Sequence, residues 1–267
     1  MRSQFSIMMA ALALGLAAQQ QSDHKEPLVL DLASVKATPP EERRGIVHQP
    51  PGNQSYEVIG MPLRPIITVA YTVTDRQISG GPDWINTDRW NIEAKAERRG
   101  TNDELHAALA RLLEDRFKLR VRHETRDQPV YILTVDKKGP KMAVHDSADL
   151  VHEPFTVGFQ NGELSVTGHN VAMDFLAFSL SRRLDRNVLD RTGLAEHYDV
   201  DFHYVPDLPA GTGGRGEGPT PINGQPVSVD GPNIFTALRE QLGLRLEKGI
   251  GPVDYLVIEH VEKPSEN

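Results

Sequence analysis

The clearest pattern of apolar and polar residues lies between Thr101 and Val135. Thr101 and Glu104 have the spacing of a capping box, in which each side chain satisfies a free amide at a helix start. Apolar residues then recur at i, i+3, i+4, i+7 and i+8, which predicts an amphipathic helix with one buried face. These residues are Leu105, Ala108, Leu109, Leu112 and Leu113.

Two strands are expected after this helix. Residues 117–121 alternate between apolar and basic side chains, which predicts a strand with one buried face. Residues 130–135 form an almost continuous apolar run, which predicts an inner strand. Between them, residues 126–129 end in a proline that has no amide to donate, so we expect a short connection there.

The same order of helix, strand and strand returns near the C-terminus, at residues 234–242, 244–247 and 253–258. Identical or similar residues match between the two copies: Leu113, Leu119, Arg120, Pro129, Val130 and Leu133 correspond to Leu238, Leu244, Arg245, Pro252, Val253 and Leu256. Weaker copies span residues 173–204 and 63–96. Repetition of one unit predicts copies that pack on one another. The alternative is that a helix followed by a hairpin is simply a common arrangement.

These patterns predict an α+β fold, with helices packed on antiparallel sheet and repeated helix-strand-strand units in two halves. The polar segment between the two best copies divides the chain into a first half, residues 26–142, and a second half, residues 154–264, joined near 143–153. A further segment, residues 206–232, is rich in glycine and proline and has little apolar surface, so we expect a surface loop.

Residues 1–19 have the outline of a secretory signal peptide: one early basic residue, an apolar run from Ile7 to Ala18, and small residues before a glutamine cluster. An uncleaved anchor is the alternative, but the run is shorter than the ~20 residues that span a bilayer. We therefore expect cleavage near Ala18 or Gln19 and a periplasmic or extracellular protein without a membrane span in its mature part.

Charge and cysteine content narrow the possible functions. The chain has 29 basic and 37 acidic residues, a net charge of −8, and no basic stretch, which argues against binding to nucleic acid. It has no cysteine, which excludes disulfides, a thiol nucleophile and thiolate metal ligands. The expected partner is an unknown protein or a ligand of the cell envelope.

The best group of chemically active residues is Asp199, Asp201 and His203. Because side chains alternate along a strand, all three share one face, where carboxylates could bind a divalent cation or His203 could act as a base. The alternative, which we favour, is a solvated strand face opposite a buried one. The ten histidines show no His-Glu-x-x-His spacing, and no Gly-x-Ser-x-Gly elbow is present. We therefore predict no metal, no cofactor and no established catalytic residue.

Five motifs in order resemble a family of proteins from soil-associated bacteria that carries a domain of unknown function. They are residues 78–84 (ISGGPDW), 115–119 (DRFKL), 129–131 (PVY), 190–194 (DRTGL) and the ending that runs from 235–238 through 261–267. The resemblance implies an exported protein that is present in many copies per genome. It implies no activity and no catalytic residues.

The absence of catalytic motifs and the expected export favour a non-enzymatic extracytoplasmic module that binds a ligand or another protein. The alternative is an extracytoplasmic hydrolase whose site assembles only in three dimensions, with Asp199, Asp201 and His203 as the candidate residues.

Overall fold

The computed structural model describes residues 26–39, 41–42, 45–49, 54–145, 155–160, 162–206 and 230–264. The predicted signal peptide and residues 207–229 of the predicted glycine-rich loop lie outside the described residues. Among the described helices, none has the length and apolar character needed to cross a membrane.

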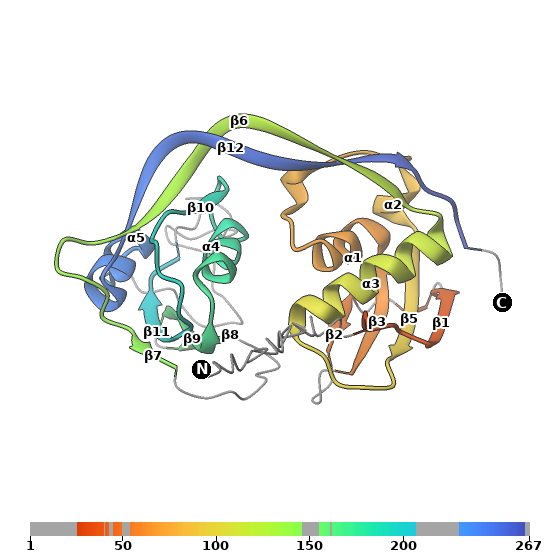
Figure 1. The fold of residues 1–267 in the computed structure, drawn as a ribbon, viewed down its shortest axis with the longest axis horizontal. Coiled ribbons are helices and arrows are strands. Elements are labelled where there is room, and N and C mark those ends of the chain that lie inside the picture. The colour runs from red at the N-terminus through yellow and green to blue at the C-terminus, as the bar shows by residue number, and fades with distance from the viewer. Residues whose placement is uncertain are drawn as a thin grey trace, which may run out of the picture.

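Two long antiparallel strands form a ribbon that runs over both lobes of the molecule (Figure 1). They are β6, Arg120–Val135, and β12, Leu244–His260, and they pair along their whole length. We call the elements under one end of this ribbon the N lobe and those under the other end the C lobe.

The N lobe contains a four-stranded antiparallel sheet in the order β1-β5-β3-β2. In Figure 1 the helices α1 and α3 lie between this sheet and the ribbon. The elements of the N lobe are β1 (Leu32–Ala37), β2 (Ile46–His48), β3 (Ser55–Pro62), α1 (Leu63–Ala70), η1 (Asp75–Gln77), β4 (Ile78–Gly80), α2 (Trp84–Thr87), β5 (Arg89–Lys95) and α3 (Asn102–Phe117).

The C lobe contains a second four-stranded antiparallel sheet in the order β7-β11-β9-β8, with α4 beside it. The short helix α5 continues into the π-helical turn η2, which leads directly to β12. The elements of the C lobe are β7 (Ala143–Val144), β8 (Phe155–Gln160), β9 (Glu163–Val171), α4 (Met173–Ser181), β10 (Val188–Asp190), β11 (Tyr198–Tyr204), α5 (Ile234–Ala237) and η2 (Leu238–Leu242).

The ribbon becomes a third sheet, in the order β10-β6-β12-β4, because each lobe adds one short parallel strand to it. In the N lobe, β4 pairs with residues 256–258 of β12, and in the C lobe, β10 pairs with residues 131–133 of β6. Between these two places the ribbon is only two strands wide.

The ribbon also joins two separate hydrophobic cores. Leu256 and Ile258 of β12 belong to the core of the N lobe, together with Phe117 and Leu119, which lie just before β6. The other ends of the two strands supply the core of the C lobe with Tyr131, Leu133, Leu244 and Leu246. Each core is therefore built from segments that are far apart in the sequence.

The lobes also touch directly beside the ribbon. One guanidinium nitrogen of Arg76 in η1 donates to the backbone oxygens of Ser181, at 3.1 Å, and Leu184, at 2.7 Å. The Thr74 hydroxyl donates to the side-chain oxygen of buried Asn187 at 3.3 Å. These bonds hold the end of α4 against the N lobe.

The predicted α+β fold is confirmed, and so is the predicted start of α3. The Thr101 hydroxyl accepts from the amide of Glu104 at 3.2 Å, and the Glu104 carboxylate accepts from the amide of Thr101 at 2.8 Å. The repetition of the unit and the division into residues 26–142 and 154–264 stay predictions.

The prediction of two strands separated by a connection at 126–129 is wrong. A single strand runs from Arg120 to Val135, and its equivalent runs from Leu244 to His260. Pro129 is tolerated because it lies where β6 has no neighbour on its outer edge, so its missing amide costs no bond to a third strand. The first predicted strand also starts later than expected, since α3 extends to Phe117 and Lys118 caps it in the left-handed conformation, with φ of 51°.

Candidate binding site between the lobes

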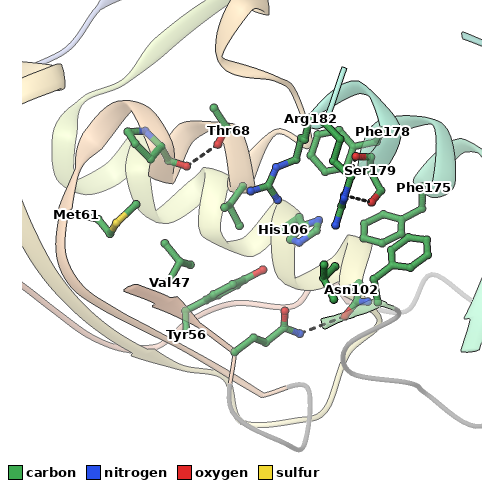
Figure 2. Close-up of a pocket in the computed structure, with 16 residues that line it drawn as sticks. Val47, Tyr56, Met61, Thr68, Asn102, His106, Phe175, Phe178, Ser179 and Arg182 are labelled. Carbon is green, nitrogen blue, oxygen red and sulfur yellow. Dashed lines mark hydrogen bonds between the residues drawn. The ribbon is translucent and has the colours of Figure 1, made fainter. Parts of the chain in front are cut away.

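A cavity of about 720 Å³ opens between the two lobes (Figure 2). The N lobe lines it with side chains from β2, β3, α1 and the first turns of α3. The C lobe lines it with side chains from β8, from α4 and from the two arginines that follow α4. The volume lies in the range of about 300–1,000 Å³ that is usual for small-molecule sites.

The N-lobe wall is centred on Tyr56 and His106. Tyr56 lies on β3 and is only 2% exposed, and its ring stacks on that of His106 at a centroid distance of 6.4 Å. The Tyr56 hydroxyl is buried and has no hydrogen-bond partner among the described residues, and Figure 2 shows it pointing toward His106. A buried hydroxyl without a partner is a costly arrangement that requires an explanation.

Thr72 also holds His106 in place, since its hydroxyl lies 3.1 Å from the His106 Nδ1 atom. Burial lowers the pKa of His106 from its ordinary value, and the charge of Asp103 opposes this only in part. The imidazole is therefore neutral at neutral pH, when it offers one hydrogen-bond donor and one acceptor.

The lowered pKa of His106 predicts a loss of stability in acid. The unfolded chain binds a proton at the ordinary histidine pKa of about 6.5, while the folded chain does so only at lower pH. The contribution of His106 is therefore fully present above pH ~6.5 and decreases as the pH falls toward the folded-state pKa. In urea unfolding at pH 7.5 and 5.5, we expect His106→Gln to lose less stability between the two values than the wild type.

The control for this experiment is the same change at His197, an exposed residue between β10 and β11. We expect His197→Gln to show the same difference between the two pH values as the wild type. An unchanged difference in His106→Gln would contradict the assignment of this acid sensitivity to His106.

The C-lobe wall is aromatic because α4 has two different faces. Its residues Met173, Leu176, Ala177 and Leu180 are buried in the lobe core. Phe175 and Phe178, three positions apart on another face, line the cavity. The Phe155 ring on β8 stacks on Phe175 with centroids 5.4 Å apart and planes 10° apart, so the two rings form one apolar stack.

Two arginines stand beside this aromatic surface. The Arg182 guanidinium lies 6.0 Å from the centre of the Phe178 ring, and Figure 2 shows it extending toward α1 and His106. Arg183 donates to the backbone oxygen of Ser179 at 2.8 Å and to its hydroxyl at 2.6 Å. Neither arginine forms an ion pair with any carboxylate in the described part of the chain.

Partial burial lowers the pKa of Arg183, and the neighbouring charge of Arg182 lowers it further, while Tyr204 acts in the opposite direction. Like charges held side by side repel each other. An anion in the cavity would relieve this repulsion.

The three predicted residues of β11 make no hydrogen bond or ion pair with one another. They do share one face of the strand, opposite the buried Val200 and Phe202, as the alternation predicts. Asp201 is exposed, and His203 faces Glu163 at 3.7 Å. A functional role for Asp199, Asp201 and His203 stays a prediction.

Asp199 instead contacts two histidines from other elements. Its Oδ1 atom lies 2.8 Å from His145 Nδ1 and 3.2 Å from His169 Nδ1, and it accepts from the amide of Asn170 at 3.3 Å. Partial burial acts to raise the pKa of Asp199, but the bonds from the histidines outweigh it, so the pKa lies below its ordinary value. No group of three metal-binding side chains with suitable geometry occurs among the described residues.

The residues that line the cavity were not predicted from the sequence. The only local signal is on α4, where Phe175, Phe178 and Arg182 recur at i, i+3 and i+7 beside the core stripe. His106 shows no signal of its own, because it lies within an ordinary amphipathic helix.

Comparison with protein families matches residues 64–261 to the family described as "Protein of unknown function (DUF3738)". The match includes about three quarters of the chain, with α1, α3, α4 and the whole ribbon. Comparisons with curated proteins and with solved structures gave no match. On the strength of this match, the chain belongs to the DUF3738 family of proteins of unknown function.

Proposed function

We propose that this protein is an exported, non-enzymatic binding protein that holds a small ligand between its two lobes. The observation that carries the proposal is the cavity of about 720 Å³, to which both lobes contribute apolar walls and separate polar groups. An apolar cavity with a few convergent polar groups is the usual form of a ligand site. The proposed export rests on the apolar segment Ile7–Ala18.

The arrangement of the lobes supports a site that is already formed. The bonds from Arg76 fix the end of α4, so Arg182 and Arg183 are held close to the N lobe. The aromatic rings of the other wall pack against one another. A site formed in advance loses less entropy when it binds a ligand.

A thermal-shift screen with and without a blocked cavity tests this proposal. We expect at least one small organic compound from a broad panel to raise the melting temperature of the wild type. At a hundredfold excess over the Kd, the stabilisation is about 2.7 kcal/mol, or about 5–10 °C for a chain of this size. Thr68→Trp places a large ring in the cavity and should abolish the shift.

The matched control is Thr125→Trp, which adds the same ring at an exposed position of β6 that does not line the cavity. Thr125→Trp should keep the full shift. A compound that stabilises Thr68→Trp as well as the wild type binds elsewhere, and if all hits behave in this way the proposal is wrong.

A further inference from the structure

We infer that the ligand of this cavity is an organic anion with a flat apolar body, such as an aromatic carboxylate, sulfonate or phosphate ester. The inference rests on the proposed function, since it names the chemical class that the same cavity recognises.

The charge of the cavity wall favours an anionic ligand. The chain as a whole is acidic, with a net charge of −8, yet no aspartate or glutamate lines the cavity among the described residues, whereas Arg182 and Arg183 do. A planar guanidinium has several donors in a fixed geometry that suits carboxylate and phosphate oxygens. The Arg182 side chain makes no hydrogen bond to any residue that the structure describes, so its donors remain available.

The aromatic wall favours a ligand with a planar apolar body. The stacked rings of Phe155 and Phe175 are nearly parallel, and the Phe178 ring, which lies near Arg182, is tilted by 46° to that of Phe175 with centroids 6.0 Å apart. Such a surface favours a planar apolar body through stacking and burial of apolar area. Because the Arg182 guanidinium lies over the Phe178 ring, 6.0 Å from its centre, a ligand that contacts both side chains has its apolar and anionic parts close together.

The N-lobe wall is also compatible with an anion, since it adds polar groups without adding negative charge. The neutral imidazole of His106 and the partnerless hydroxyl of Tyr56 lie opposite the arginines. Neither group carries a negative charge, so neither repels an anion.

A pair of fluorescent probes separates the anionic group from the apolar body. 8-Anilinonaphthalene-1-sulfonate and N-phenyl-1-naphthylamine share one ring system, and only the first carries a negative charge. The Kd of each is measured by fluorescence titration at low ionic strength. We expect both probes to bind the wild type, and Arg182→Gln combined with Arg183→Gln to raise the Kd of the sulfonate about tenfold or more. The Kd of the neutral probe should change less than about threefold.

Three further variants make the result specific. Arg182→Gln alone removes a guanidinium that makes no hydrogen bond to any described residue. This variant should therefore fold normally and still raise the Kd of the sulfonate severalfold. Arg245→Gln, on β12, removes an exposed arginine that pairs with Glu247 at 2.6 Å outside the cavity, and should change neither Kd. Phe178→Ala should raise the Kd of both probes.

The outcomes also distinguish this inference from the proposed function. If the neutral probe binds in the cavity but the arginine variants leave the Kd of the sulfonate unchanged, the anion inference is wrong and the proposed function stands. If neither probe binds the wild type, or if Thr68→Trp displaces neither, the anion inference is wrong, and the thermal-shift panel alone decides the proposed function.

Discussion

Replacing Leu256 by alanine should lower the free energy of unfolding of the N lobe by about 2–5 kcal/mol. Leu256 is 1% exposed and lies in the N-lobe core, although its strand begins in the C lobe. The change removes buried apolar volume and leaves a cavity that the surrounding side chains can fill only in part. The result would show that the end of the chain completes the core of a lobe that begins near its start.

Tryptophan fluorescence reports on this lobe alone. The chain has two tryptophans, Trp84 and Trp90, and both contribute to the N-lobe core. In urea unfolding followed by fluorescence, we expect Leu256→Ala to shift the midpoint strongly to lower urea concentration. Far-UV circular dichroism, which reports on both lobes, provides the comparison.

Leu244→Ala is the matched control, because Leu244 lies on the same strand, is 0% exposed and belongs to the C-lobe core. It should shift the circular dichroism transition while moving the fluorescence midpoint much less. If both variants shift the fluorescence midpoint equally, the two cores unfold as one unit, and the expectation that they unfold separately is wrong.

Local signals predict the helices of this protein well. The spacing of Thr101 and Glu104 fixes the start of α3, and the periodicity of the leucines fixes its buried face. The α+β class follows from such segments because helical and strand periods differ clearly. The alternation of β11 is equally local, and residues 200 and 202 are buried as expected.

The ribbon could not be predicted in the same way. A proline after a polar stretch is typical of a turn, and nothing near Pro129 indicates that residues more than 100 positions later will pair with it. The pairing of β6 with β12 supplies the backbone bonds that make one long strand more favourable than two short ones. The residues that determine this pairing are distributed over both strands, so no local pattern indicates it.

The sequence did not indicate the candidate site between the lobes, for a related reason. Tyr56, His106 and Arg182 lie on different elements, and each is ordinary in its own surroundings. Their combination depends on how the lobes are held together, for example by Arg76. The group on β11 was predicted because its residues are close in sequence. In the structure Asp199 contacts His145 and His169, which lie on other segments, and the spacing of residues on β11 does not indicate these contacts.

Replacing Gly243 by alanine should destabilise the protein by about 2–5 kcal/mol. Gly243 ends η2 in the left-handed conformation, with φ of +68°, and it is buried. An added Cβ would overlap the backbone oxygen of Gly139, which belongs to the turn after β6. That turn is bonded to the same place, since the amide of Asp136 donates to the Gly243 oxygen and the amide of Lys141 to the Leu242 oxygen, both at 2.9 Å. The turn therefore cannot move away without breaking backbone bonds at the start of the ribbon.

Gly193→Ala separates the two causes of this loss. Gly193 has nearly the same conformation, with φ of +69°, but nothing lies within 4 Å of an added Cβ. The free energy of unfolding of Gly193→Ala should therefore fall only by the cost of placing alanine in the left-handed region, about 1–2 kcal/mol. The excess loss in Gly243→Ala, measured by urea unfolding under the same conditions, is the cost of displacing the turn at Gly139. Equal losses in the two variants would mean that the turn moves freely, and that the contact between η2 and the start of the ribbon contributes nothing to stability.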